Sequence, residues 1–285
     1  MQTLHSLDPL RRAVAGLRES GKIALVPTMG ALHEGHLTLV REARKRADHV
    51  VVSIFVNPLQ FGANEDLDKY PRQLERDSAL LAAEGVALLW APTVEAMYPQ
   101  GFASNISVSG VSDGLCGASR PGHFDGVATV VCKLFNQVLP DVALFGEKDW
   151  QQLAVIRRMT RDLDLTRPHV DAVLGVATVR EEDGLAKSSR NAYLSQEQRA
   201  QAVTLPTAMK AAIAAIESGE PVAAALAGLD SALLDGGFSS VDYAELRDAD
   251  ALTLLEKRGE APMRLLVAAR IGTTRLIDNM PVAPK

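Results

Sequence analysis

The sequence has few cysteines, few aromatic residues, no basic block and no long apolar run. Its two cysteines, Cys116 and Cys132, match no metal-binding or redox spacing, which fits a reducing compartment. There are 30 basic and 35 acidic residues, a net charge of −5, so we do not expect nucleic acid as a partner. No apolar run approaches about 18 residues, and the first residues, MQTLHSLDPLRRAV, have no signal-peptide apolar region. The composition therefore predicts a cytoplasmic protein with no membrane partner.

The length and the apolar composition indicate an α/β protein. A chain of 285 residues, 47% hydrophobic and 5% aromatic, predicts a fold rich in Ala, Val and Leu, with two domains favoured over one. Up to residue 176, apolar runs alternate with helical patterns, which is typical of a parallel sheet with crossover helices. The predicted strands are residues 23–26, 50–56, 86–92 and 142–145, the predicted helices are 71–85, 126–138 and 150–163, and short strands are expected within 97–116.

The character of the sequence changes after residue 176. A polar stretch is followed by a helical region at 195–218, where Ser195 is the expected N-cap and Gln198 completes a capping box. A further helix and three strands are predicted at 223–234, 241–246, 264–270 and 274–278. We therefore predict a parallel-sheet domain over residues 1–176 and a smaller α+β domain over residues 177–285.

One stretch, Pro27 to His36 (PTMGALHEGH), has the form of a phosphate-binding turn. It follows the apolar run 23–26 and precedes a helical pattern, so the order is strand, glycine-containing turn and helix. A helix N-terminus presents unpaired N–H groups and a partial positive charge, and glycine lets backbone approach a ligand. His33 lies three residues before His36, so the two share a face of a helical turn. The stretch predicts the nucleotide half of an active site.

Two alternative roles for this stretch compete with nucleotide binding. A strand–glycine–helix turn is common in α/β proteins and is more often structural than catalytic. The histidines could also bind a metal, but the zinc-protease pattern HExxH spaces them four residues apart, and no Cys/His cluster completes a site here.

Two further polar motifs follow predicted strands, and ligands of open α/β sheets bind outside the carboxyl ends of the strands. In NPLQF, Gln60 is either a ligand-binding amide or an ordinary loop amide. In GEKDWQQ (146–152), Lys148 can meet a phosphate as a point charge, although a solvated turn is the alternative. Gln151 and Gln152 begin the next helix and can donate to and accept from a hydroxy acid. Three such motifs at one edge of the sheet predict a shared site.

Three other groups are weaker candidates. The segment 187–190 (KSSR) suits a mobile loop closing over polyphosphate, while capping of the following helix explains its serines equally well. Asp66, Asp68 and Asp77 could help to hold Mg²⁺, which prefers oxygen ligands, or could be solvated surface residues. The RPGHF stretch (120–124) could meet an anionic substrate or could form a turn.

Taken together, these motifs resemble one family, the pantoate–β-alanine ligases or pantothenate synthetases. The resemblance runs in order through VPTMGALHEGH, SIFVNPLQF, EDLDKYPR, MYP, RPGHFDGVATVV, LFGEKDWQQ and DGLAKSSRNAYLS. It implies a Rossmann-like nucleotidyltransferase domain with a small C-terminal lid domain, assembled as a homodimer. It also implies that ATP and Mg²⁺ are used to adenylate (R)-pantoate with release of pyrophosphate. The amine of β-alanine then attacks the pantoyl adenylate, which gives pantothenate and AMP.

The resemblance also assigns roles to residues of this sequence. His36 matches the histidine assigned as proton donor, His33 pairs with it over the phosphates, and Lys148 is a third catalytic residue. Gln60 and Gln152 match the glutamines that bind pantoate, with Gln60 also near the β-alanine site. The acidic residue near the metal is Asp77, and the implied ATP-binding residues are Met29, Gly30, Ala31, Leu32, His33, Glu34, Gly35, His36, Gly146, Glu147, Lys148, Asp149, Val179, Lys187, Ser188, Ser189 and Arg190.

One position departs from the family pattern. Where these ligases commonly have an apolar residue, this sequence has Lys187, which adds a phosphate contact if it points into the site and changes nothing if it points outward. KSSR also resembles the KMSKS loop of class I aminoacyl-tRNA synthetases. Two alternative functions stay open: a nucleotidyltransferase that stops at a nucleotide adduct, and an RNA-binding relative of those synthetases, against which the acidic composition argues.

Overall fold

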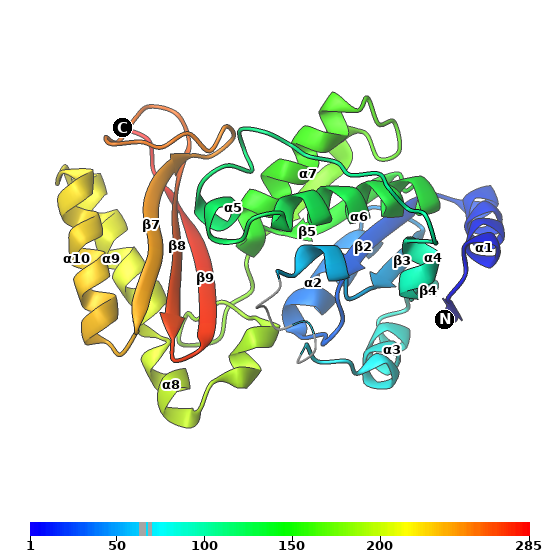
Figure 1. The fold of residues 1–285 in the computed structure, drawn as a ribbon, viewed down its shortest axis with the longest axis horizontal. Coiled ribbons are helices and arrows are strands. Elements are labelled where there is room, and N and C mark those ends of the chain that lie inside the picture. The colour runs from blue at the N-terminus through cyan, green and yellow to red at the C-terminus, as the bar shows by residue number, and fades with distance from the viewer. Residues whose placement is uncertain (63–66, 68–69) are drawn as a thin grey trace. The chain divides into compact units, whose positions relative to one another are not determined.

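The computed structural model describes residues 1–62, 67 and 70–285, and the chain divides into two compact units (Figure 1). The first unit comprises residues 1–112, 120–147 and 152–177. The second comprises residues 178–285 together with two short segments from earlier in the chain, 113–119 and 148–151.

The first unit is built on a six-stranded sheet whose neighbouring strands are all parallel, in the order β1-β4-β3-β2-β5-β6. The strands are β1 (Gln2–Leu4), β2 (Ile23–Thr28), β3 (His49–Ile54), β4 (Leu88–Trp90), β5 (Val142–Gly146) and β6 (Val173–Val176). Four of them coincide with the predicted strands, and the parallel α/β fold is confirmed. The edge strands β1 and β6 were not predicted.

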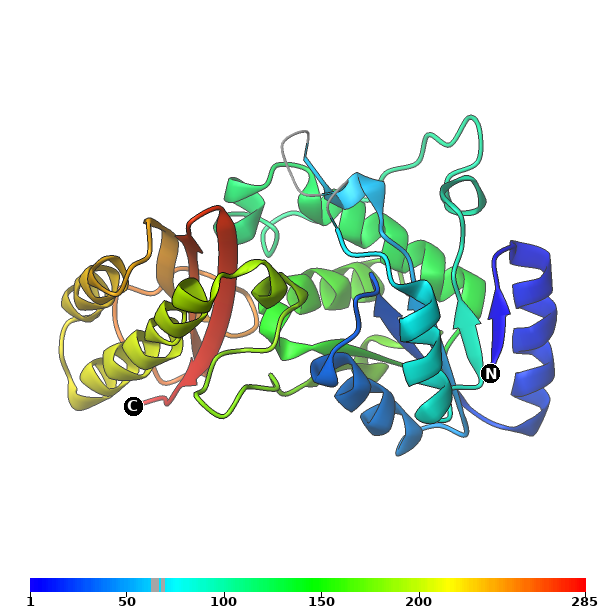
Figure 2. The ribbon, with the colours of Figure 1, turned by 90° about the horizontal axis from the view of Figure 1, so that it is seen from below.

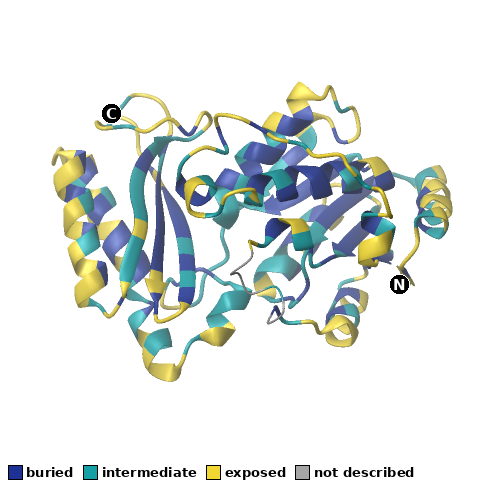
Figure 3. Ribbon diagram, viewed as in Figure 1, coloured by how far each residue is buried: buried dark blue, intermediate teal, exposed yellow. Residues whose placement is uncertain are grey.

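Apolar residues on both faces explain why the central strands form at all. Val51 and Val52 in β3 are both fully buried although they point to opposite sides of the sheet, as expected for a strand covered on both faces. Strands of the first unit are largely coloured as buried in Figure 3. One face packs Ala24, Val26 and Val52 against the buried side of α2 and α3 in a single core cluster. The sheet therefore holds the ends of β2 and β3 rigidly beside each other.

Helices connect these strands and cover the sheet. Along the first part of the chain they are α1 (Leu7–Ser20), α2 (Glu34–Arg44), η1 (Pro58–Gln60), α3 (Leu74–Ala83), α4 (Val94–Met97), α6 (His123–Val138), η2 (Glu147–Asp149), α7 (Trp150–Asp162) and η3 (Val170–Ala172). The short strands expected within 97–116 are absent from the described residues there, so that prediction was wrong. This segment instead runs as irregular chain, and Ile106 donates its N–H to the Thr129 side chain rather than to a strand (2.9 Å).

The second unit is a three-stranded antiparallel sheet with two helices on one face (Figures 1 and 2). Its elements are α5 (Leu115–Ser119), η4 (Ser189–Tyr193), α8 (Gln196–Gln201), α9 (Thr204–Ser218), α10 (Val222–Asp235), β7 (Ser240–Asp248), β8 (Met263–Ile271) and β9 (Thr274–Val282). Leu205, Met209 and Leu229 from the helices share a core with Leu265 and Val267 of β8. Among the described residues, no helix combines the length and apolar character that crossing a membrane requires.

The region predicted as one helix over 195–218 is two helices, α8 and α9. The predicted capping box at its start is confirmed: Gln198 donates its N–H to Ser195 Oγ (3.2 Å), and Gln198 Oε1 accepts from the Ser195 N–H (3.1 Å). The helix is interrupted at residues 202 and 203, because Pro206 at the start of α9 has no N–H for the carbonyl of Ala202 and its ring clashes with that carbonyl.

Candidate active site

The turn that follows β2 has a backbone that few sequences can adopt. Gly30 and Ala31 both have positive φ angles, +85° and +51°, in the left-handed region. Thr28 supports the turn, since its hydroxyl donates to the Ser53 carbonyl of β3 (2.8 Å) and accepts from the Gly30 N–H (3.2 Å). A Cβ on Gly30 would lie 3.1 Å from the Ile54 side chain, so glycine also provides room here. The turn is thus fixed to the carboxyl ends of two adjacent strands.

Asp77 holds the same turn from the opposite side. It lies on α3, is fully buried, and accepts the N–H groups of Ala31 (2.8 Å) and Leu32 (3.0 Å) on its two carboxylate oxygens. A carboxylate that accepts two backbone hydrogen bonds in a buried site is strongly held, which makes it a fastening for the turn.

This geometry does not fit the metal role that the family resemblance gave to Asp77. Both of its oxygens face backbone N–H groups, whereas a Mg²⁺ ligand directs an oxygen at the ion. Within the described part of the chain, no group of three or more His, Cys, Asp or Glu residues could hold a metal ion. Asp66 and Asp68, the other acidic candidates, lie outside the described residues.

His33 and His36 form the capped N-terminus of α2. His33 is the N-cap, its Nδ1 accepts from the Gly35 N–H (3.1 Å), and His36 Nδ1 accepts from the His33 N–H (3.3 Å). The ring centroids are 4.1 Å apart. An imidazole that accepts through Nδ1 and is neutral carries its proton on Nε2. Both rings therefore present Nε2–H donors at the positive end of the α2 dipole, a suitable arrangement for binding phosphate.

Gly35 is required by this packing of the histidines. A Cβ at Gly35 would lie 2.9 Å from Cε1 of His33, closer than a real side chain approaches. The second glycine of the motif thus makes room for an imidazole ring, in addition to the backbone access that the sequence suggested.

Gln60 ends the short helix η1 and has a defined amide orientation. Asn57, which is buried, donates through Nδ2 to Gln60 Oε1 (2.9 Å) and to the Gly126 carbonyl (3.0 Å). The Tyr98 hydroxyl donates to Asn57 Oδ1 (2.8 Å), and burial raises the pKa of this phenol above its usual value, so it stays a donor. Because Gln60 accepts through its oxygen here, its Nε2–H₂ end is the one suited to donating to a ligand.

The RPGHF stretch holds the main chain of Gln60. Arg120 donates to the Gln60 carbonyl (3.2 Å), and His123 Nδ1 lies 2.9 Å from the same oxygen, as a donor in the matching tautomer. Its other ring nitrogen lies 3.0 Å from Arg120 Nη1. Sequence analysis left this stretch open between an anion site and a turn, and these contacts show that it braces η1.

Lys148 and the glutamines after it are divided between the two units. Gly146, Glu147 and Gln152 belong to the first unit, and Gln152 is half-buried on α7. Lys148 belongs to the second unit, with its ammonium 3.7 Å from an Asp149 carboxylate oxygen.

Gln151 has a structural part in the second unit. Its Oε1 accepts from the Cys116 N–H (3.1 Å), and its Nε2 donates to the Asp113 carbonyl (3.3 Å). Sequence analysis named the Gln151 amide as a possible substrate contact. In the structure this amide instead binds the segment 113–119 to α7.

The loop that contains KSSR is a hairpin in the second unit. The Lys187 N–H donates to the Val179 carbonyl (2.9 Å), and the Lys187 ammonium forms an ion pair with Glu181 (2.6 Å). The additional cation of this sequence is thus directed at a carboxylate of its own hairpin. Ser188 Oγ accepts from the Arg190 N–H (3.3 Å) at the start of η4, so capping, the alternative weighed from the sequence, accounts for this serine.

We expect Asp77→Asn to destabilise the turn without changing the metal requirement. An amide accepts from one of the two N–H groups but turns its NH₂ toward the other, which costs about 1–3 kcal/mol of unfolding free energy. ATP binding should weaken, while the Mg²⁺ concentration for half-maximal activity at saturating ATP should not change. Thermal unfolding, nucleotide titration and Mg²⁺ titration measure the three effects.

The control for this variant is Glu75→Gln, an exposed position on the same helix, which should shift unfolding by less than about 0.5 kcal/mol. A higher Mg²⁺ requirement seen with the Asp77 variant and not with the Glu75 variant would restore the metal role.

Comparison with known proteins assigns the chain to a family. The family model of the pantoate-beta-alanine ligases matches residues 2–281. The chain belongs to the pantoate–β-alanine ligase family. Similar members include the pantothenate synthetase of Novosphingobium aromaticivorans, 70% identical and covering 100% of both chains. That of Sphingopyxis alaskensis is 61% identical and covers 99% of this chain and 100% of its own.

Solved structures of pantoate–β-alanine ligases have the same fold. Pantothenate synthetase from Thermus thermophilus is 49% identical, with a TM-score of 0.91 over 100% of both chains. The ligase from Francisella tularensis is 32% identical, with a TM-score of 0.82 over 98% of this chain and 97% of its own. It was solved in complex with β-γ ATP and β-alanine.

Sequence analysis of this ligase missed several residues that shape the site. Asn57 and Tyr98 lay within quoted motifs but were given no role. An asparagine directly before Pro58 is a signal for a helix cap, and Asn57 does accept the Leu59 N–H (3.2 Å), so its position was detectable. Its second function, holding the Gln60 amide, depends on the fold and had no local signal.

Proposed function

We propose that this pantoate–β-alanine ligase condenses (R)-pantoate with β-alanine in two steps at one site. In the first step the pantoate carboxylate attacks the α-phosphorus of ATP, the pantoyl adenylate forms and pyrophosphate leaves. In the second step the amine of β-alanine attacks the acyl carbon, the amide bond forms and AMP leaves. The observation that carries this proposal is the pair of Nε2–H donors of His33 and His36 at the N-terminus of α2.

The electrostatics of the first unit suit the nucleotide half of the reaction. The two imidazoles supply N–H donors without a change of conformation, and preorganised donors stabilise charge as it develops on phosphate oxygens. The N–H groups of Ala31 and Leu32 are used by Asp77, so the turn contributes by holding these rings in place. We place ATP along residues Met29 to His36 and along Gly146 to Asp149. His36 acts as the proton donor, and His33 donates to the phosphates beside it.

In this proposal Gln60 and Gln152 bind pantoate. The oriented amide nitrogen of Gln60 donates to pantoate, and Gln152 supplies a second amide. The enzyme forms no covalent bond to either substrate in this proposal. Most of the acceleration therefore comes from binding both substrates in fixed positions.

The second unit supplies cations in this proposal. Lys148 and Arg190, together with Val179, Ser188 and Ser189, bind the polyphosphate and offset its charge as pyrophosphate leaves. Lys187 joins them by leaving its ion pair with Glu181. In this proposal residues 177–285 act as a lid domain, and residues 1–176 act as the nucleotide- and pantoate-binding domain.

Mg²⁺ enters this proposal as a partner of ATP. The ion, when bound to the phosphate oxygens, supplies positive charge that offsets theirs. In this proposal the protein contributes donors to the phosphates, such as the imidazoles of His33 and His36. The resemblance further supports a homodimer in the cytoplasm.

The reaction is tested by following pyrophosphate and AMP separately. Protein with ATP, Mg²⁺ and pantoate should release pyrophosphate, and AMP should appear only when β-alanine is added. Absence of AMP with all three substrates would contradict the ligase. Pyrophosphate release that is never followed by AMP, even with β-alanine present, would favour a nucleotidyltransferase that stops at the adduct.

A further inference from the structure

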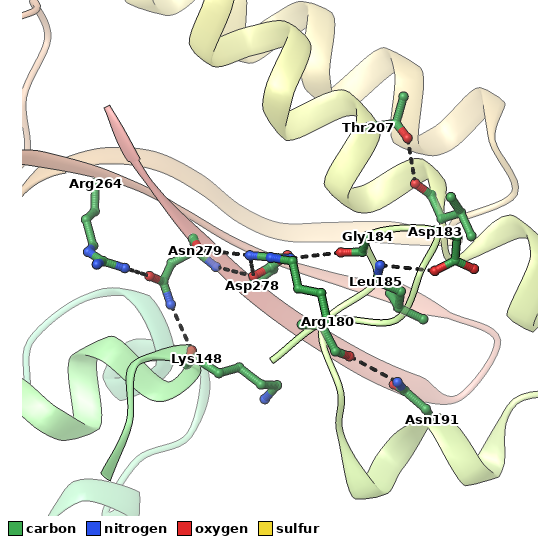
Figure 4. A network of polar contacts seen from close by, with 12 residues as sticks. Lys148, Arg180, Asp183, Gly184, Leu185, Asn191, Thr207, Arg264, Asp278 and Asn279 are labelled. Atoms are coloured by element: carbon green, nitrogen blue, oxygen red, sulfur yellow. Dashed lines mark hydrogen bonds and ion pairs between the residues drawn. The ribbon is translucent and has the colours of Figure 1, made fainter. Parts of the chain in front are cut away.

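Asn279 on β9 joins two strands of the second unit to the main chain of Lys148. The asparagine is buried, and its Nδ2 donates to the Lys148 carbonyl oxygen (2.9 Å). Its Oδ1 accepts from the guanidinium of Arg264 on β8. Figure 4 shows this amide between Arg264 on one side and the Lys148 carbonyl on the other. Both ends of the amide are therefore engaged, which fixes its orientation.

A second contact holds the same segment two residues later. The Arg264 guanidinium stacks over the Trp150 ring, 3.4 Å from its centroid, and the Trp150 indole N–H donates to the Ala249 carbonyl (2.8 Å). Residues Lys148 and Trp150 are thus both attached to the antiparallel sheet. These contacts explain why residues 148–151 group with the second unit although the preceding strand β5 belongs to the first.

The neighbouring residue Asp278 holds the hairpin that leads to KSSR. Its side chain is completely buried and takes a bidentate ion pair from Arg180 (2.6 and 2.9 Å), whose guanidinium also donates to the Gly184 carbonyl (3.0 Å). The Asn279 N–H donates to the same carboxylate (2.8 Å). A buried ion pair of this kind holds its partners firmly, because separating them leaves an uncompensated charge. Two consecutive residues of β9 therefore hold both cationic segments of the second unit (Figure 4).

We infer that Asn279 is a positioning residue for adenylation: it holds the Lys148 main chain to β9, so that the ammonium of Lys148 is placed for the phosphates of ATP. This inference rests on the proposed function, which gives Lys148 its phosphate contact. A lysine acts as a point charge on a flexible stem, so the position of its main chain sets the region that its ammonium reaches. Displacement of a catalytic group by about 1 Å can cost roughly 10²-fold in rate.

The test is the isosteric variant Asn279→Asp. It keeps the acceptor that faces Arg264 but turns an oxygen, instead of an N–H group, toward the Lys148 carbonyl. We expect the single-turnover rate of pyrophosphate release from ATP and pantoate to fall about 10- to 100-fold, while the pantoate concentration that gives the half-maximal rate stays within about 2-fold. Hydrogen exchange of the 146–151 peptide should become faster. Asn279→Ala, which adds no charge, should give the same result and serves if the aspartate variant does not fold.

Asp242→Asn is the matched control. Asp242 on β7 pairs with Arg270 (3.2 Å) and Arg275 (2.7 Å) on the same sheet, and no contact that it makes in this network reaches Lys148. The Asp242→Asn substitution should lower thermal stability about as much as Asn279→Asp does. It should leave the rate of pyrophosphate release within about 2-fold of wild type. An equal loss of turnover in both variants would mean that any weakening of the sheet suffices, and would overturn the inference.

A double-mutant cycle with Lys148→Ala decides whether Asn279 acts through the lysine. Lys148→Ala alone should slow pyrophosphate release. In that background Asn279→Asp should reduce the rate by no more than about a further 2-fold, because coupled residues are not additive. The inference would be overturned if the double variant lost rate by the product of the two single-variant losses. It would also be overturned if Asn279→Asp alone kept the wild-type rate. Wild-type protein that releases no pyrophosphate would instead reject the proposed function.

Discussion

Replacement of His36 by alanine should slow pantothenate formation by about 10²- to 10³-fold. The variant loses the Nε2–H donor that we place at the phosphate undergoing attack. It also loses the Nδ1 acceptor that caps α2, which costs about 0.5–2 kcal/mol of stability. Pre-steady-state measurement of pyrophosphate release should locate the loss in the adenylation step.

Two further substitutions at this position separate catalysis from capping. Asparagine places its oxygen where the imidazole has Nδ1, so His36→Asn keeps the acceptor for the His33 N–H but has no group at the Nε2 position. Glutamine reaches the Nε2 position with an N–H donor but cannot transfer a proton. We expect His36→Asn to unfold at the wild-type temperature and to be as slow as the alanine variant, with His36→Gln faster than both. Near-wild-type turnover of His36→Asn would disprove the role of Nε2.

Gly126→Ala should have the largest effect on stability. A Cβ at Gly126, inside α6, would lie 2.2 Å from the Leu59 carbonyl oxygen and 2.9 Å from the Gln60 nitrogen. These atoms are main chain and cannot swing aside, so η1 must move away from α6. We expect a loss of about 3 kcal/mol or more, together with a higher KM for pantoate, because the shift carries Gln60 with it. Urea unfolding and steady-state kinetics measure the two effects.

Gly16→Ala is the control for this substitution, because Gly16 lies inside α1 of the same unit and a Cβ there would meet nothing within 4 Å. It should stabilise the protein by about 0.5–1 kcal/mol, since alanine loses less backbone entropy in a helix. If Gly126→Ala unfolds like Gly16→Ala and keeps the wild-type KM, the close approach of η1 and α6 is not a requirement of the site.

The long apolar runs of the sequence were sufficient to predict the parallel α/β fold. A run such as Val50–Val52 is informative by itself, because only a strand covered on both faces buries every residue. The short strands β1 and β6 carry no such pattern. The stretch 97–116 contains strand-like residues but pairs with no strand in the described part of the chain, and it runs as irregular chain between α4 and α5.

The strand–turn–helix at residues 27–36 was readable from the sequence because its signals are local. Glycines, a following helical pattern and two histidines three residues apart lie within ten positions, and the observed caps use those same neighbours. The sequence by itself therefore determined the family, the fold class and the place of the turn that we propose binds phosphate.

Only the tertiary structure decided how the site is held together, because those contacts join residues far apart in the chain. Asp77 meets Ala31 across 46 positions, Asn57 meets Gly126 across 69, and Asn279 meets Lys148 across 131. No spacing rule connects such pairs, since which carboxylate or amide meets which main-chain group depends on how the helices and strands pack. For this reason the sequence left Asp77 open between a carboxylate near Mg²⁺ and a solvated one, whereas the fold shows it accepting two N–H groups of the turn.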